Sequence, residues 1–236
     1  MKKLSSLSIF FPSLNDAKML PYLIYKTYEI APKVARSFEV IIINDGSDDD
    51  TKEVLDTLKK KYKNLVPIHH RKNTGYGGAL TAGFRHARKE WIFYTDGDGQ
   101  YDPSDLILLA KQANSRTDVV NGYKLRRIDN KARQAIGWAY NKLLREVYRV
   151  PISDVDCDFR LIRSSVLRKI DLTCRSGMIC LELILKLHDV GARFSEVGVS
   201  HYSRRFGRSQ FFRPKHLFKT LTEHLVFYKS RKLAKT

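Results

Sequence analysis

The chain has 236 residues, of which 43% are hydrophobic, and carries a formal net charge of +18 at pH 7. This length and apolar content suffice for one substantial core, and because no Pro/Gly/Ser-rich stretch divides the chain, we expect a single domain. Three cysteines without a CxxC pair argue against a disulfide framework and a zinc site, and no apolar run approaches the ~20 residues that a membrane-spanning helix needs. The positive charge predicts a polyanionic partner, such as nucleic acid, anionic lipid or a phosphorylated substrate.

Strand and helix patterns alternate along the first half of the chain. Apolar runs typical of buried strands cover residues 7–11, 38–43, 65–69, 91–95 and 118–122. Helical patterns follow the polar turns; they run to residue 30, cover residues 51–62, begin near residue 79, and begin again after Pro103. For the last of these helices, Asp102 is the expected N-cap and Asp105 stands in capping-box position. The alternation predicts right-handed βαβ units and an open, twisted, mostly parallel α/β sheet with helices on both faces.

The run of residues 91–94 ends at two carboxylates, Asp96 and Asp98, separated by one glycine. Like charges held this close are costly unless a cation neutralises them, so the pattern indicates Mg²⁺ or Mn²⁺ bound through oxygen, with room for phosphate oxygens. Gly97 and Gly99 are expected to permit a tight turn and to leave space above the metal. The alternative is a solvated Asp/Gly turn without a metal. The other motifs of the chain have to decide between the two.

Other polar turns follow the remaining predicted strands and share the edge where an open α/β sheet binds its ligand. They contain Asp16, Asp45 and a glycine loop at residues 73–78. This loop lacks the GxxxxGK[ST] of a phosphate-binding P-loop, and Leu80 occupies the last glycine position of a GxGxxG, so a P-loop NTPase and a dehydrogenase are both disfavoured. The remaining possibility is a site in which carboxylates and backbone hold a nucleotide and a metal binds its phosphates.

Six short motifs follow one another in a recognisable order between residues 7 and 209. They are Pro12 with Asn15-Asp16; Asn44-Asp45-Gly46-Ser47; Asn73-x-Gly75-x-Gly77-Gly78-Ala79-x-x-x-Gly83; Asp96-Gly97-Asp98-x-Gln100; Asp154-x-x-Cys157-x-Phe159-Arg160; and His201-Tyr202-Ser203-Arg204-Arg205-x-Gly207-x-Ser209. The series resembles the inverting family 2 glycosyltransferases with the GT-A fold. The last motif is similar to a signature of the polyprenyl-phosphate branch of that family.

The resemblance implies a nucleotide-sugar donor site with Asp16 and Asp45 on the base and ribose, and with Asp96 and Asp98 at the metal and diphosphate. Asp16 stands where the family usually has Glu, and Asn44 where it often has Asp, which changes the reach to the base or ribose. The implied donor-binding residues are Pro12, Asn15, Asp16, Asp45, Gly75, Gly78, Asp96, Gly97, Asp98 and Gln100, with Asp96 and Asp98 as metal ligands.

The sequence leaves two classes of acceptor open, a hydroxyl and a phosphate. A hydroxyl acceptor on a glycan or other soluble molecule would need a general base, which the segment with Asp154, Asp156 and Asp158 could supply, with Asp154 as the candidate. A phosphate acceptor is already anionic and needs cations, for which Lys124, Arg126, Arg160, Arg204 and Arg205 are candidates. The resemblance favours transfer of a hexose from a UDP- or GDP-sugar to a polyprenyl phosphate at the cytoplasmic membrane face, with Asp98, Asp154, Arg126 and Arg204 as the catalytic set. Nucleic acid is disfavoured as a partner because the turns at the ligand edge are acidic.

The end of the chain has a different pattern. We expect a GT-A domain over residues 1–210 and a basic amphipathic segment over residues 211–236, in which Leu217, Phe218, Leu221, Leu225 and Tyr228 recur at helical spacing among lysines. Such a helix can lie on an anionic membrane surface, or it can pack on the core. Before this segment in the chain, Glu182 lies in a mostly apolar helical pattern. It either borders the acceptor site or forms a buried ion pair.

Overall fold

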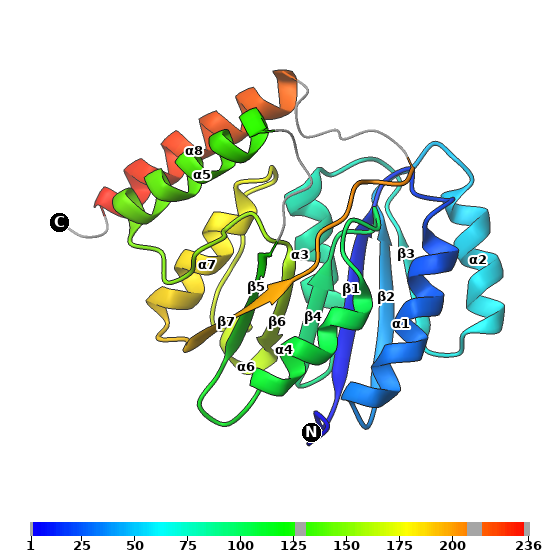
Figure 1. Cartoon of the computed structure of the whole chain (residues 1–236). Coiled ribbons are helices and arrows are strands. Elements are labelled where there is room, and N and C mark those ends of the chain that lie inside the picture. Colours follow the sequence, from blue (N-terminus) through cyan, green and yellow to red (C-terminus); the bar gives the residue numbers. More distant parts are fainter. Residues whose placement is uncertain (1, 126–130, 207–213, 234–236) are drawn as a thin grey trace.

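A central sheet organises the molecule. In the computed structural model, which describes residues 2–125, 131–206 and 214–233, the sheet has seven strands in the order β3-β2-β1-β4-β6-β5-β7 (Figure 1). The strands are β1 (Leu7–Ser13), β2 (Phe38–Asn44), β3 (Leu65–His69), β4 (Trp91–Thr95), β5 (Val119–Lys124), β6 (Phe159–Arg163) and β7 (Phe194–Val199). β1 to β4 run parallel, β5 is parallel to β7, and β6 runs antiparallel to both β4 and β5. The predicted open, mostly parallel α/β sheet and its five predicted strands are confirmed.

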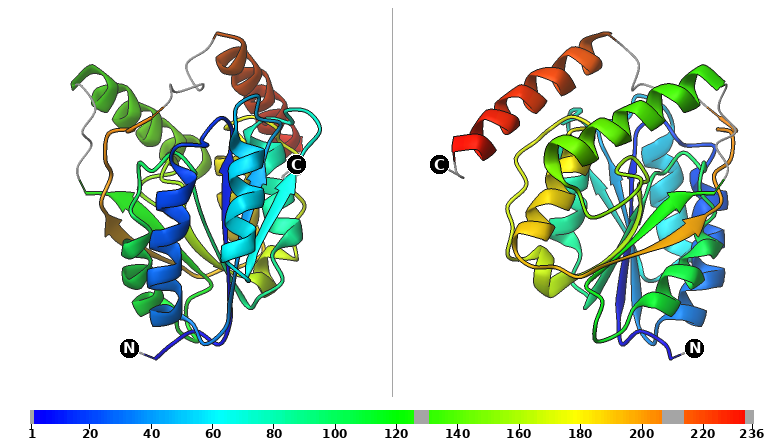
Figure 2. Two further views of the ribbon diagram at one scale, coloured as in Figure 1. Left: turned by 90° about the vertical axis from the view of Figure 1, so that its right-hand side faces the viewer. Right: turned by 60° about the vertical axis from the view of Figure 1, so that its left-hand side comes forward.

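Helices cover both faces of this sheet, as predicted (Figures 1 and 2). The helices are α1 (Leu20–Val34), α2 (Thr51–Lys61), α3 (Tyr76–His86), α4 (Leu106–Gln112), α5 (Lys131–Tyr148), α6 (Ser164–Leu167), α7 (Ile179–Asp189) and α8 (Pro214–Leu233), with a 3₁₀ turn η1 (Pro103–Asp105) before α4. Side chains alternate along β1, so Ile9 and Phe11 pack with α1 and α4 while Phe10 packs with α3 and α7. Two apolar cores therefore form, one on each face of the sheet.

The polar turns after β1, β2, β3 and β4 meet at one edge because these four strands are parallel. Pro12 and Ser13 extend β1 beyond its predicted end, and the Pro12 carbonyl accepts a hydrogen bond from the Gly97 amide (3.1 Å). Asp102 caps η1 by accepting from the Ser104 amide (2.8 Å), as predicted. The capping-box prediction for Asp105 is wrong, since its carboxylate accepts instead from the Ser200 amide (2.7 Å) and ties β7 to this edge.

The C-terminal helix α8 lies beside α5 and α7 on one side of the molecule (Figure 2). His224 hydrogen-bonds with the Tyr148 hydroxyl of α5 (3.0 Å), and Arg231 forms an ion pair with Asp189 at the end of α7. Glu223 accepts from the Ser176 amide (3.0 Å) and hydroxyl (2.7 Å) in the loop before α7. Among the described residues, no helix has the length and apolar character required to traverse a bilayer.

Candidate active site

Carboxylates from three segments converge at the edge formed by the parallel strands. Asp96 and Asp98 follow β4, Asp16 follows β1, and Asp158 immediately precedes β6. Burial raises the pKa of Asp16 to about 6, with the Asp98 carboxylate adding to the shift. Burial also raises the pKa of Asp96 well above its usual value, with further contributions from Asp158 and Asp98, although the Tyr76 hydroxyl donates to Asp96 (2.7 Å). The site therefore concentrates more negative charge than its own donors neutralise, so it favours a bound cation.

One arginine enters this acidic group from a distant part of the chain. The Arg204 guanidinium donates to Asp98 (2.5 Å), and its charge lowers the pKa of Asp16 and Asp96, against the effect of burial. Gln100 fixes the segment, because its side chain donates to the Tyr202 carbonyl (3.1 Å) and its carbonyl accepts from the Tyr202 amide (2.8 Å). The sequence-predicted residues Gln100, Asp98 and Arg204 are thus brought together, with a fixed cation beside the carboxylates.

The donor set of the acidic group suits a hard divalent cation that shares its coordination with a substrate. Asp96 and Asp98 offer only oxygen atoms, the ligands that Mg²⁺ and Mn²⁺ prefer. Among the described residues, no group of three or more His, Cys, Asp or Glu side chains is arranged to hold a metal ion. Two carboxylates with phosphate oxygens from a ligand are a common arrangement for Mg²⁺, so the residues present fit a metal that binds together with a diphosphate.

The glycines around these carboxylates do not leave open space, contrary to prediction. A Cβ on Gly97 would lie 2.7 Å from the Pro12 carbonyl oxygen, and a Cβ on Gly99 would lie 2.2 Å from the Met19 side chain. Gly99 also has a φ of 72°, which disfavours other residues. These glycines let the β4 turn pack closely against the segment after β1, which brings Asp16 towards Asp98.

Asp45 holds the glycine loop at the second turn of the edge. The Asp45 side chain is 3% exposed; it hydrogen-bonds with His70 Nδ1 (2.7 Å) and accepts from the amide (3.0 Å) and hydroxyl (2.6 Å) of Thr74. Nearby, Asn15 has a φ of 61°, and its side chain accepts from the Asp48 amide (3.0 Å), which joins the turns after β1 and β2. The turns that carry the predicted base-and-ribose residues are therefore joined, but the Asp45 oxygens are engaged by the loop at residues 70–74.

The glycine loop rests on the loop before α7. The Gly77 amide donates to the Arg175 carbonyl (3.2 Å), and a Cβ on Gly77 would lie 2.3 Å from the Cys174 carbonyl oxygen. Glu182 is fully buried below this loop, where it accepts from the amides of Thr173 (3.0 Å) and Cys174 (2.8 Å) and from Lys186 Nζ (2.8 Å). Glu182 thus forms the buried ion pair considered from sequence and supports the glycine loop through residues 173–175.

The acceptor-side candidates divide into three groups. Asp154 is 6% exposed and lies 3.7 Å from Lys124 Nζ, so these two candidates partly neutralise each other. Arg160 is fully buried and donates to Asn121 (2.6 Å) and Asp158 (3.1 Å), so the prediction that it holds a phosphate is wrong. Arg126 lies outside the described residues.

A family model spans the strands and turns that build this site. The model of glycosyl transferase family 2 matches residues 8–171, well over half of the chain. The chain belongs to glycosyl transferase family 2. This match confirms the family resemblance seen in the sequence. The matched region contains Asp16, Asp45, Asp96 and Asp98, and Arg204 follows it.

Curated relatives of this family 2 chain share a name. Undecaprenyl-phosphate 4-deoxy-4-formamido-L-arabinose transferase of Edwardsiella ictaluri (strain 93-146) is 25% identical over 211 residues, which cover 89% of this chain and 64% of the relative. The enzyme of the same name from Klebsiella pneumoniae (strain 342) is 26% identical over 205 residues, which cover 86% of this chain and 62% of the relative. The chain thus spans a little under two thirds of the length of these relatives. Their name includes a polyprenyl phosphate, in agreement with the branch that the Arg204 motif resembles.

Solved structures confirm the predicted GT-A fold. Glucosyl-3-phosphoglycerate synthase from Mycobacterium tuberculosis, in complex with Mn²⁺, uridine-diphosphate and glucosyl-3-phosphoglycerate, superposes with a TM-score of 0.66 at 15% identity, covering 86% of this chain and 73% of that chain. Mannosyltransferase PcManGT from Pyrobaculum calidifontis, in complex with GDP-Man and Mn²⁺, has a TM-score of 0.67 at 18% identity, covering 95% of this chain and 65% of that chain.

Several site residues of this family 2 chain were missed from sequence. Tyr76 contacts Asp96, and His70 and Thr74 contact Asp45. Asp158, expected in the acceptor-side segment, instead acts on Asp96 through its charge. The signal that could have found these residues is position, since His70 and Thr74 follow β3 and Tyr76 begins α3 at the ligand edge of the sheet.

Proposed function

We propose that this family 2 chain transfers a hexose from a UDP- or GDP-sugar to a polyprenyl phosphate at the cytoplasmic face of a membrane. The convergence of Asp16, Asp96 and Asp98 with Arg204 at the ligand edge carries the proposal. This edge combines an oxygen-only site for a metal and a diphosphate with an arginine that can hold a second phosphate. The names of the curated relatives support the lipid phosphate as the second ligand.

On the donor side, Asp16 with Pro12 and Asn15 receives the base and ribose, and Gly75 and Gly78 line the diphosphate. Asp45 acts by holding the loop at residues 70–74, because its oxygens are already engaged there. Asp96 and Asp98, assisted by Gly97 and Gln100, would hold Mg²⁺ or Mn²⁺, and such a metal would neutralise the charge that develops on the leaving diphosphate.

On the acceptor side, an oxygen of the polyprenyl phosphate attacks the anomeric carbon while the bond from that carbon to the diphosphate breaks. The electron pair of that bond leaves with the nucleoside diphosphate. The nucleophile is already anionic, so no proton has to be removed, and Arg204 and Arg126 orient it. Asp154 would act as a base only for a hydroxyl acceptor, and its ion-pair distance to Lys124 (3.7 Å) favours a structural role.

The C-terminal segment, residues 211–236, provides contact with the membrane in this proposal. On α8 the side chains of Phe218, Leu221 and Leu225 are 60–70% exposed, and Lys219, Lys229 and Lys232 are exposed beside them. An apolar stripe flanked by lysines suits the interface of an anionic bilayer. A lipid acceptor would then meet Arg204 near the surface that holds the protein.

A donor screen with a polyprenyl-phosphate acceptor tests the proposal. Purified protein is incubated with radiolabelled UDP- and GDP-sugars, Mg²⁺ or Mn²⁺, and a polyprenyl phosphate in detergent. We expect one donor to give a labelled lipid that is absent when EDTA is added. Labelling of free glycans but not of the lipid phosphate, together with abolition of turnover by Asp154→Asn, would instead establish the hydroxyl-acceptor reaction.

A further inference from the structure

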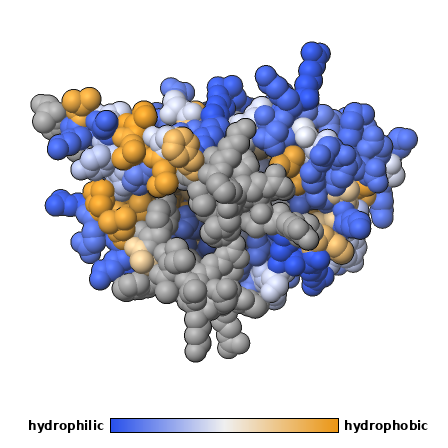
Figure 3. All heavy atoms as spheres, turned by 90° about the horizontal axis from the view of Figure 1, so that it is seen from above, coloured by the Kyte–Doolittle hydropathy of each residue, from blue (hydrophilic) through white to orange (hydrophobic). Residues whose placement is uncertain are grey.

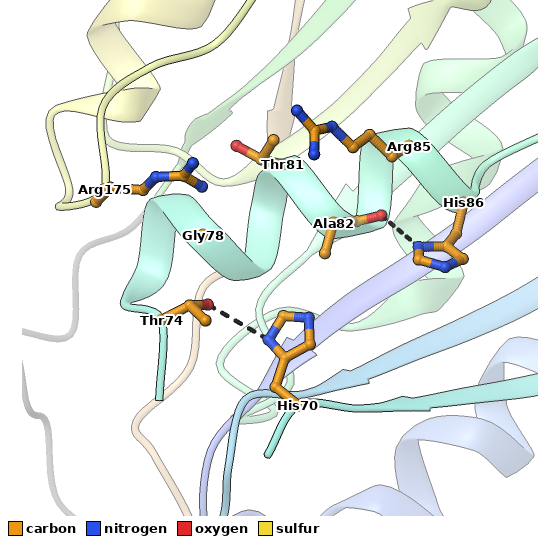
Figure 4. A pocket seen from close by; sticks show the side chains of 8 residues that line it. All are labelled: His70, Thr74, Gly78, Thr81, Ala82, Arg85, His86 and Arg175. Atoms are coloured by element: carbon orange, nitrogen blue, oxygen red, sulfur yellow. Dashed lines mark hydrogen bonds between the residues drawn. The ribbon is translucent and has the colours of Figure 1, made fainter. Parts of the chain in front are cut away.

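A basic pocket runs along α3, from His70 and Thr74 beside the ligand edge to Arg85 and His86. It has a volume of about 300 Å³ and is lined by His70, Thr74, Gly78, Thr81, Ala82, Arg85, His86 and Arg175 (Figure 4). Gly78, Thr81, Ala82 and Arg85 follow the i, i+3, i+4, i+7 spacing of one helix face. Tyr76, on another face of α3, points to Asp96 instead, and Gly78 is shared with the proposed diphosphate site, so the pocket adjoins the proposed donor site.

The pocket collects positive charge without a carboxylate in its lining. Figure 4 shows the side chains of Arg85 and Arg175 approaching Thr81 from opposite directions, although one comes from α3 and the other from the loop before α7. Within the described part of the chain, neither guanidinium makes a hydrogen bond or ion pair with a protein group. Two arginine forks that face one cavity repel each other unless an anion lies between them.

The two histidines are held with a ring nitrogen available. His70 Nδ1 is engaged by Asp45 (2.7 Å), and His86 Nδ1 by the Ala82 carbonyl (2.9 Å), so Nε2 of each ring has no partner within the described residues. The hydroxyl of Thr81 already donates to the Gly77 carbonyl (2.7 Å), and that of Thr74 to Asp45 (2.6 Å). The donors available to a ligand are therefore the guanidinium groups and, when protonated, the histidine Nε2 atoms.

We propose that this pocket is a second anion site, which binds a phosphomonoester group. Guanidinium forks pair with phosphate oxygens through two parallel hydrogen bonds, and a phosphate dianion neutralises both arginines. A volume of about 300 Å³ exceeds the size of a lone phosphate and admits a small organic phosphate or the headgroup of a lipid phosphate. His70 and Thr74 contact Asp45 as well as the pocket, so the ligand is adjacent to the loop that holds the proposed donor site.

The test follows the imidazole signals of His70 and His86 in ¹H–¹⁵N spectra while glycerol phosphate is added at constant ionic strength. EDTA is present throughout, so that no metal bridges phosphate to the acidic edge. We expect saturable shifts of both histidines in the wild-type protein, and a fall in affinity of about tenfold or more in Arg85→Gln/Arg175→Gln. The matched control, Arg116→Gln/Arg168→Gln, removes the same charge at exposed positions outside the pocket and should bind as the wild type does.

Vesicles distinguish the two sources of the phosphate. Phosphatidylcholine vesicles with and without phosphatidic acid are compared, with the same variants and the same histidine signals. Shifts with phosphatidic acid that the pocket variant alone loses would identify a lipid headgroup, and shifts with glycerol phosphate alone would identify a free metabolite. The proposal is overturned if neither ligand gives saturable shifts, or if the control variant loses binding as much as the pocket variant. Arg85 and Arg175 are exposed, so their substitution should leave the fold intact, and Arg85→Gln alone serves as a second, milder variant.

Discussion

The charge of Asp98 is balanced by a single arginine from a segment more than one hundred residues away. Asp98 is 6% exposed, accepts from the Gln100 amide (2.9 Å) and pairs with Arg204. Removing its charge takes away one proposed metal ligand and the partner of Arg204 together. In the proposed reaction both groups face the place where negative charge develops, so the loss should fall on the rate more than on the fold.

We expect Asp98→Asn to lower turnover by about 10²-fold or more while the protein keeps its thermal unfolding transition. Turnover is measured with the donor and lipid phosphate identified by the screen, and unfolding by circular dichroism. The control is Asp171→Asn, which removes one exposed carboxylate in the loop before α7. Equal turnover in Asp98→Asn and the control would remove Asp98 from the catalytic set.

Asp16 should make the free energy of unfolding depend on pH. Burial raises its pKa from 3.8 to about 6, so between those values the folded protein holds a proton that the unfolded chain releases. This contribution to stability is complete below the unfolded pKa and is lost as the pH rises through about 6. In EDTA, the free energy of unfolding of the wild type relative to Asp16→Asn should therefore fall as the pH rises from about 4 to 6. Urea titrations of both proteins at several pH values measure this difference, and a difference that stays constant from about pH 4 to 6 would contradict the prediction.

At this scale the sequence predicted the carboxylates better than their partners. Asp16, Asp45, Asp96 and Asp98 are recognisable because each follows an apolar strand, and parallel strands deliver their carboxyl ends to one edge. The contacts of His70 with Asp45 and of Asp158 with Asp96 depend on which strands are neighbours, which local pattern does not encode. Arg160 was mistaken for a phosphate ligand because a charged residue in a short strand gives no sign of complete burial.

At the scale of elements, the glycine loop depends on a loop from another part of the chain. Residues 173–175 are held from below by Glu182 and from the side by Glu223 of α8, and their carbonyls meet Gly75 and Gly77. The atoms that a Cβ on Gly77 would meet belong to the backbone, which cannot give way as a side chain can. A substitution there should displace the loop that lines the proposed diphosphate site.

We expect Gly77→Ala to lower the free energy of unfolding by about 2 kcal/mol and to weaken binding of the nucleoside diphosphate. Urea unfolding and calorimetry measure the two effects. Gly191→Ala is the comparison, because a Cβ there meets nothing within 4 Å and only the φ of 77° opposes it. That variant should cost about 1 kcal/mol and leave nucleotide binding unchanged. Unchanged nucleotide affinity in Gly77→Ala would separate the glycine loop from the donor site.

The elements that sequence predicted poorly are those with a mixed environment. The strands β1, β2 and β4 carry continuous apolar runs because both of their faces are buried. β7 is half-buried along most of its length, and β6 has Arg160 and Arg163 among its five residues, so neither gives an apolar run or a clean alternation. Their pairing with β5 and β4 is set by tertiary contacts, which also explains why the antiparallel β6 was not foreseen.

For the whole molecule, the distribution of charge matters more than its sum. The chain carries +18 overall, yet the ligand edge gathers Asp16, Asp96, Asp98 and Asp158. A basic protein with an acidic site attracts anionic surfaces over long distances, while the proposed donor site requires a cation before it accepts a diphosphate.

Apolar side chains gather over α5 and α8 on one side of the upper face (Figure 3). The exposed apolar residues there are Leu143 and Val147 of α5 with Phe218, Leu221, Leu225 and Val226 of α8, each 46% exposed or more. On the opposite side of α8, Phe227 is buried while Glu223 and Arg231 hold neighbouring loops. The helix is therefore anchored through one face and offers the other to a partner, which we propose is an anionic bilayer.

We expect Leu221→Asp/Leu225→Asp to reduce binding to vesicles that contain anionic lipid by at least about tenfold, because burial of each leucine is worth roughly 1.5–3 kcal/mol. Sedimentation with vesicles of defined anionic content measures it, and higher salt should weaken wild-type binding, since lysines contribute. Gln112→Asp/Ser115→Asp adds the same charge at exposed positions, one at the end of α4 and one in the loop after it, and should bind as the wild type does. Turnover on a short, water-soluble prenyl phosphate should change little in both variants, because α8 is anchored through Glu223 and Arg231 and neither leucine is buried. Wild-type protein that ignores vesicles but forms dimers by light scattering, with dimers lost in the leucine variant, would show that a second copy covers this surface.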